Sequence, residues 1–74
     1  MPRPQIYEAI DTEREYQDEK FGPAFDAGNT FEQWLGYIKT YVHKTEKGEY
    51  SRREGLVKIA SLAVAALEQE DNNG

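Results

Sequence analysis

Acidic side chains recur at helical spacing near the start of this sequence. Asp11, Glu15 and Asp18 are separated by four and three residues, so a helix would place them on one face, which Glu19 extends. Carboxylates at this spacing can hold a divalent cation, which prefers oxygen ligands, or attract a basic partner. The same pattern is also typical of an ordinary solvated helix surface, so the spacing leaves three interpretations open.

Other residues that could perform chemistry are few. The chain has no cysteine, which excludes disulfides and thiolate metal sites, and its single histidine, His43, cannot form a zinc site without carboxylates. We expect His43 in solvent or at a rim. The sequence contains neither a glycine-rich phosphate-binding loop nor a Ser-His-Asp constellation. Tyr37, Tyr41 and Tyr50 could stack on a nucleobase, although aromatic residues at helical spacing more often belong to a core or an interface.

The composition narrows the class of function. The 74 residues make one domain, 1–74, with a formal net charge of −5. Because nucleic-acid binding needs a basic surface, direct binding is not expected, whereas a protein partner with a basic surface suits this charge. The longest apolar run, 56–67, is shorter than the roughly 20 residues that span a bilayer, and the first ten residues lack the apolar segment of a signal peptide. We therefore expect a cytoplasmic protein without membrane contact.

Helical periodicity and capping signals predict three helices, over about residues 4–20, 31–47 and 52–70. Thr30 and Ser51 each begin a capping-box pattern, and Gly48 is placed to end the second helix. The tail, 71–74, should fray. Because the connections are short, the sequence predicts an all-α fold, a small three-helix antiparallel bundle.

The inner face of the first predicted helix is unusually polar. Glu13, Arg14 and Gln17 occupy positions where a core helix would carry leucine. These side chains could form hydrogen bonds between helices, or they could belong to a binding site.

The third predicted helix is the centre of the expected fold. Its apolar residues lie on more than one side, so neighbours must cover most of it. A single core in so short a chain supplies only roughly 3–5 kcal/mol, and small domains often add a partner subunit. We predict a homo-oligomer, most simply a twofold dimer that completes its core through the third helix. The expected interface residues are Leu56, Val57, Ala60, Val64 and Leu67.

Three segments, in their order and spacing, carry a family resemblance. Residues 13–22 have the sequence EREYQDEKFG, the second helix opens with Trp34-Leu35-x-x-Ile38, and residues 53–68 have the sequence REGLVKIASLAVAALE. Together they resemble the all-α MazG-like nucleotide pyrophosphohydrolase superfamily, in the compact form found in phages and prophages. The first segment is similar to the family's ER-x-x-Q-x-x-K-W-G opening, with Phe21 in place of tryptophan.

The resemblance also implies where a metal site would lie. Active members hold Mg²⁺ with an E-E-x-x-E motif on one helix and an E-x-x-D-type motif on the next, and the metal orients a water and neutralises phosphate charge. The five acidic positions correspond to Thr40, Tyr41, Lys44, Gly55 and Lys58, none of which carries a carboxylate. Two ammonium groups would repel a cation there. We therefore expect no metal, no other cofactor and no magnesium-dependent cleavage.

Three functions remain as expectations. The leading one is a catalytically inactive MazG-like phage or prophage protein that binds a host or phage protein, as an inhibitor or accessory factor, through its acidic first helix. The second is a metal-independent binder of nucleotides or phosphate. The third is a Mg-dependent NTP pyrophosphohydrolase whose ligands have moved to Asp11, Glu15 and Asp18. The candidate ligand-binding residues of the second are Arg14, Lys39, Tyr41, Lys44 and Lys58.

Overall fold

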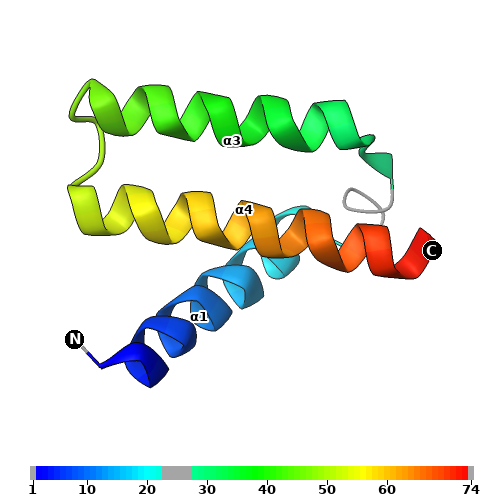
Figure 1. Ribbon diagram of the computed structural model, residues 1–74, viewed down its shortest axis with the longest axis horizontal. Coiled ribbons are helices and arrows are strands. Elements are labelled where there is room, and N and C mark those ends of the chain that lie inside the picture. Colours follow the sequence, from blue (N-terminus) through cyan, green and yellow to red (C-terminus); the bar gives the residue numbers. More distant parts are fainter. Residues whose placement is uncertain (1, 23–27, 74) are drawn as a thin grey trace.

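One helix lies in the middle of the fold, with another helix on either side. The computed structural model describes residues 2–22 and 28–73, with side chains as far as Asp71. The described chain forms three helices: α1 (Arg3–Phe21), α3 (Phe31–Glu46) and α4 (Arg52–Asn73). α4 packs against both α1 and α3, which are not packed against each other within the described residues. Figure 1 shows α3 antiparallel to α4 and α1 crossing α4 obliquely. The predicted all-α bundle around the third helix is confirmed.

Local signals in the sequence account for most of the helix ends. The Thr30 hydroxyl accepts the Gln33 backbone N–H at 3.2 Å and the Gln33 side chain accepts the Thr30 N–H at 2.8 Å, which completes the predicted capping box. Gly22 ends α1 at φ 81°, and Gly48 follows α3 at φ 84°. Because side chains rarely adopt positive φ, glycine suits both positions. At the start of α4, the Ser51 hydroxyl accepts the Glu54 N–H at 3.1 Å.

The C-terminus corrects one prediction. α4 continues to Asn73, beyond the predicted end near residue 70, while the fraying expected over 71–74 stays a prediction. The reason is local, because no glycine or proline interrupts the sequence between Gly55 and Gly74. None of the described helices combines the length and apolar character needed to cross a bilayer.

α3 and α4 meet along an apolar interface. Trp34, Leu62 and Ala65 form its buried core, and Tyr37 is one of the partly buried residues packed against it. Gly55 of α4 is buried against Thr45 of α3. A Cβ atom on Gly55 would overlap the Thr45 side chain, with 2.8 Å to Thr45 Cβ. The glycine, which costs helix propensity, is therefore explained by close packing.

α1 and α4 are in close contact at Ser61. Ser61 is fully buried there, and its hydroxyl donates to Val57 O at 2.7 Å and lies 3.4 Å from Ile10 O of α1. The small side chain lets the α1 backbone approach α4.

The residues expected at an oligomer interface divide into two groups. Leu56 and Leu67 are 62% and 64% exposed, whereas Val57, Ala60 and Val64 are partly buried. Dimerisation itself stays a prediction.

Candidate functional site

A cavity of about 420 Å³ opens between α1, α3 and α4, and most of its wall is aromatic. We call it the aromatic pocket. Six aromatic residues of the described chain line it: Tyr16, Phe21, Trp34, Tyr37, Tyr41 and Tyr50. The remaining lining residues are Glu13, Gln17, Lys20, Lys58 and Leu62. Ligand pockets of this size typically combine apolar walls with a few polar groups that orient the ligand.

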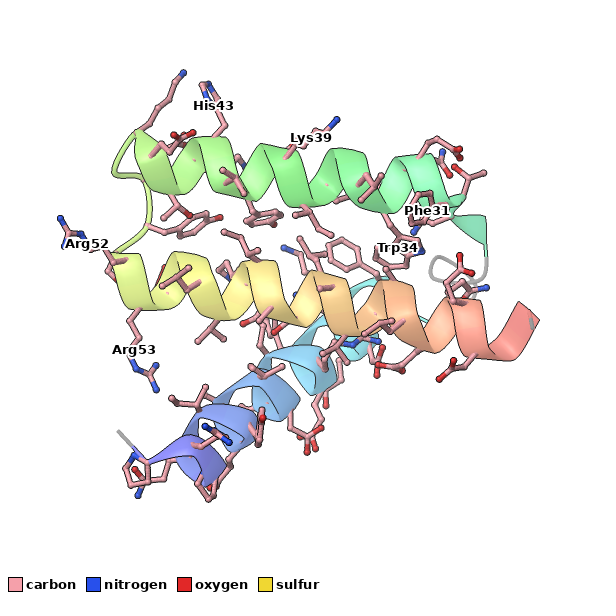
Figure 2. All side chains as sticks on the ribbon, viewed as in Figure 1. Phe31, Trp34, Lys39, His43, Arg52 and Arg53 are labelled. Atoms are coloured by element: carbon pink, nitrogen blue, oxygen red, sulfur yellow. The ribbon has the colours of Figure 1, made fainter. Side chains whose placement is uncertain are left out.

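The aromatic rings form two pairs along α3. Trp34 and Tyr37 meet edge to face with centroids 5.9 Å apart, and Figure 2 shows Trp34 between α3 and α4. Tyr41 stacks on Tyr50 with centroids 5.8 Å apart and 20° between the ring planes. Trp34 is 3% exposed, and its Nε1 has no hydrogen-bond acceptor among the described residues. A buried N–H of this kind is costly, so the pocket wall carries an unused donor.

A lysine and a glutamate form a bridge inside the pocket. Lys58 Nζ lies 3.2 Å from Glu13 Oε2, which also accepts a hydrogen bond from Gln17 Nε2 at 3.2 Å. The ammonium lies 5.4 Å from the Tyr50 ring centroid, within range of a cation–π contact. Burial alone would lower the Lys58 pKa, but the hydrogen bond from Lys58 to Glu13 and the Glu13 charge outweigh it, so the pKa lies above its usual value. The bridge links α1 to α4.

On the side of α1 away from the aromatic pocket, Arg14 binds α4 through an ion pair with Glu68. The residue is only 6% exposed, and three acceptors surround its guanidinium. Nε donates to Glu68 Oε1 at 3.1 Å, Nη1 to Gln17 Oε1 at 3.0 Å and Nη2 to Asp18 Oδ1 at 3.0 Å. The carboxylates of Asp18 and Glu68 are about half exposed, so the cation is buried while its partners reach water. Arg14 therefore positions the helix, with its donors directed to neighbouring side chains.

A second hollow, of about 660 Å³, runs along the Arg14 side of α1. We call it the acidic groove. Five carboxylates and one guanidinium line it, a formal net charge of −4, while the whole chain carries −5. The charged residues are Glu8, Asp11, Arg14, Glu15, Asp18 and Glu68. Tyr7, Ile10 and Val64 contribute an apolar floor. The chain's excess negative charge is thus concentrated beside one hollow.

The structure separates the five predicted ligand-binding residues. Tyr41 and Lys58 line the aromatic pocket, whereas Arg14 lines the acidic groove. Lys44 Nζ lies 5.3 Å from the Tyr41 ring centroid. Lys39 is exposed and points away from α4 (Figure 2). The cations therefore do not gather at a single point, and the pocket contains only one of the three lysines.

The positions that the family resemblance assigns to a metal lie only partly together: Tyr41 and Lys58 line the aromatic pocket, and Lys44 lies against the Tyr41 ring. Gly55 is buried against Thr45, and Thr40 is exposed. Across the described residues there is no group of three or more His, Asp or Glu side chains arranged to hold a metal ion. His43 is exposed on the outer side of α3, as expected (Figure 2).

Sequence reasoning missed part of the aromatic pocket. Tyr37, Tyr41 and Tyr50 were predicted from the sequence as stacking candidates, whereas Tyr16 and Lys20 were not predicted to join them. Their spacing of four residues places both on one side of α1, next to Gln17, and this was the available signal. Comparison with protein-family models, curated proteins and solved structures finds no match to this chain.

Proposed function

We propose that this chain is a catalytically inactive MazG-like protein that acts in the cytoplasm as a homodimer and binds another protein of host or phage. Its acidic groove holds a basic, amphipathic segment of that partner. The family relationship is part of the proposal and is supported by the three sequence segments that resemble the superfamily.

The charge distribution carries this proposal. The acidic groove has a formal net charge of −4, and Glu8, Asp11 and Glu15 are all exposed along it. Arg14 is already surrounded by Asp18, Glu68 and Gln17, so it does not oppose an incoming cation strongly. A hollow lined with one sign of charge raises the local concentration of opposite charge and speeds association.

The apolar residues that line the acidic groove indicate that the partner segment also carries apolar side chains. Tyr7 is 63% exposed, and Ile10 and Val64 lie beside it in the lining. A segment that alternates lysine with leucine could satisfy both the carboxylates and this floor. Groove binding by amphipathic segments follows this pattern of charged rim and apolar centre.

A peptide titration tests the proposed function. The probe is a short helical peptide with lysine on one face and leucine on the other. Replacing Glu8, Asp11 and Glu15 by Gln, Asn and Gln should weaken binding, at about 0.5 kcal/mol for each exposed pair, by roughly tenfold. The matched control replaces three exposed acids elsewhere, Glu32, Glu46 and Glu49, by Gln.

The outcome is read from the two triple variants together. Binding that is weaker in the groove variant than in the control, and that falls with added salt, supports the proposal. Equal weakening in both variants would show that only net charge matters and would contradict groove binding.

The aromatic pocket favours a second candidate function, metal-independent binding of a nucleotide. The pocket brings together the stacked rings of Tyr41 and Tyr50, the Lys58 cation and the buried Trp34 N–H, which has no acceptor among the described residues. Stacking of a base on an aromatic side chain contributes about 1–3 kcal/mol. A phosphate would have to compete with Glu13 for Lys58, so we expect nucleotide binding to be weak.

Trp34 provides the assay for this candidate because it is the only tryptophan in the chain. AMP, added without Mg²⁺, should change its fluorescence, and Tyr50→Leu should weaken that binding roughly tenfold through lost stacking. Lys39→Met, at an exposed position away from the pocket, should leave it unchanged. Inorganic phosphate alone should not reproduce the signal, and an unresponsive Trp34 would refute this candidate.

A further inference from the structure

The side of α3 and α4 opposite the aromatic pocket has no helix over it within the described residues. In Figure 1 the C-terminal end of α1 passes behind α4, which leaves the near side open. Helical spacing places five large apolar residues there, each more than a third exposed, about half a turn from the pocket residues Tyr37 and Lys58. We call them the apolar face: Phe31, Leu35, Val42, Leu56 and Leu67.

The exposed area of the chain matches the need of a dimer. The chain exposes 5441 Å², whereas a compact monomer of its 8.5 kDa would expose about 4650 Å². The excess, roughly 800 Å², equals what one partner buries in an interface of standard size. The buried apolar core is correspondingly thin, with Trp34, Leu62 and Ala65 as its members among the described residues. A second layer of helices over the apolar face would complete it.

The exposed stripe of α4 is complementary to itself in the antiparallel direction. Its residues follow the alternating three- and four-residue spacing of a coiled-coil interface. They are Arg53, Leu56, Ala60, Ala63, Leu67 and Glu70. When the stripe is read from its C-terminal end, the spacing is the same, the two alanines are still central and a leucine still flanks each of them. The arginine and the glutamate, at the two ends, change places. Two antiparallel copies would therefore place Leu56 against the partner's Leu67 and let the helices approach at the alanines.

The charges at the ends of α4 favour the same arrangement. Arg52 and Arg53 open the helix beside one acid, Glu54 (Figure 2), while Glu70 and Asp71 lie near its end and no basic residue occupies the last turn. The helix dipole favours the reverse order, with acids first and bases last. An antiparallel partner would set each basic end beside an acidic end, which offsets this unfavourable placement.

α3 fits the same symmetry axis. Thr45 of α3 packs on Gly55 of α4, and the two helices run antiparallel. The numbers of neighbouring α3 and α4 residues therefore add up to about 100 along the whole contact. An axis between Ala60 and Ala63 then passes near residue 38 of α3. Leu35 would face the partner's Val42 across that axis.

We infer that two copies pack through their apolar faces about a twofold axis perpendicular to α3 and α4, with the α4 helices antiparallel. This arrangement rests on the homodimer proposed above and is independent of the acidic groove. It keeps Leu56, Ala60 and Leu67 of the interface predicted from sequence. Val57 and Val64 lie toward α1, where they line grooves together with Ile10, and Leu56 and Ala60 line one of these grooves as well.

A charge exchange tests the arrangement. One variant carries Arg52→Glu and Arg53→Glu, a second carries Glu70→Lys and Asp71→Lys, and a third combines all four. Within one chain the two ends of α4 are about 25 Å apart, so they cannot pair with each other. Sedimentation equilibrium should show the wild type as a dimer at micromolar concentration, each double variant about 30-fold weaker, and the combined variant restored.

The helix dipole makes the expected result distinctive. Each double variant places its new charges favourably for an isolated helix, so monomer helicity should be kept while association weakens. Ala63→Glu at the axis should give monomers, and Thr40→Glu, at an exposed position outside the apolar face, should not. A monomeric wild type would overturn the inference together with the proposed homodimer. A dimer that does not respond to the charge exchange would overturn this packing alone.

Discussion

Replacing Gly55 by alanine should destabilise the protein, although alanine is the better helix former. The added Cβ of α4 would overlap the Thr45 side chain of α3, including a 2.8 Å approach to Thr45 Cβ. Overpacking of this kind costs about 1–3 kcal/mol, and the gain in helix propensity is at most about 1 kcal/mol. We expect a net loss of about 1 kcal/mol, which lowers Tm by about 4–8 °C in a chain of this size.

Thermal unfolding followed by circular dichroism measures this effect, with all variants at one protein concentration because dimerisation would shift Tm. Thr45→Ala removes the obstacle, and the hydroxyl it deletes bonds to Tyr41 O at 2.7 Å within the same helix, so its own cost should be small. Gly55→Ala combined with Thr45→Ala should recover or exceed wild-type stability. A single Gly55→Ala variant as stable as the wild type would show that the helices can move apart at no cost, and that close packing does not explain Gly55.

Three further predictions concern the contact between α1 and α4 and the proposed dimer interface of α4. Because Glu13 raises the Lys58 pKa, the stabilisation from this bridge is complete below the unfolded pKa of about 10.4 and is lost as pH rises through the folded pKa, so the stability difference between wild type and Lys58→Met should shrink at high pH. A difference that stays constant to pH 12 would contradict this sign. Ala63→Cys should oxidise to a disulfide-linked dimer, whereas Thr40→Cys should not. Equal amounts of cross-linked dimer for the two variants on non-reducing gels would contradict the proposed symmetry axis. Arg14→Met should cost only about 1–2 kcal/mol in urea unfolding, because its carboxylate partners are half exposed and can rehydrate; a loss above about 4 kcal/mol would indicate that those carboxylates become buried without a partner.

Local structure was predictable from the sequence because its causes are local. The spacing of apolar residues and the Thr30 capping box identify the helices, and the two-sided apolarity of 56–67 identifies α4 as the central one. The end of α4 was misplaced, since acidic and amide residues weaken a helix without stopping it. Glycine or proline would have been needed, and the first comes at Gly74.

The candidate sites were less predictable because they depend on contacts between distant residues. Glu13 and Lys58 are 45 positions apart, and nothing in either segment specifies the other as its partner. Arg14 was rightly singled out, but sequence alone left open whether it served a ligand or a helix interface. Its burial, together with Glu68 from α4, favours the interface. Tyr16 joins the tyrosines of α3 only because α1 crosses α4 obliquely.

Chemical-shift mapping of the ¹⁵N-labelled chain with the lysine–leucine peptide tests the central claim, that this is a binding protein whose site is the acidic groove. The largest shifts should fall on Glu8, Asp11 and Glu15 of α1 and on Val64 of α4, which line that groove. Shifts centred on Tyr41 and Tyr50, or spread evenly over the exposed acids of the chain, would contradict it.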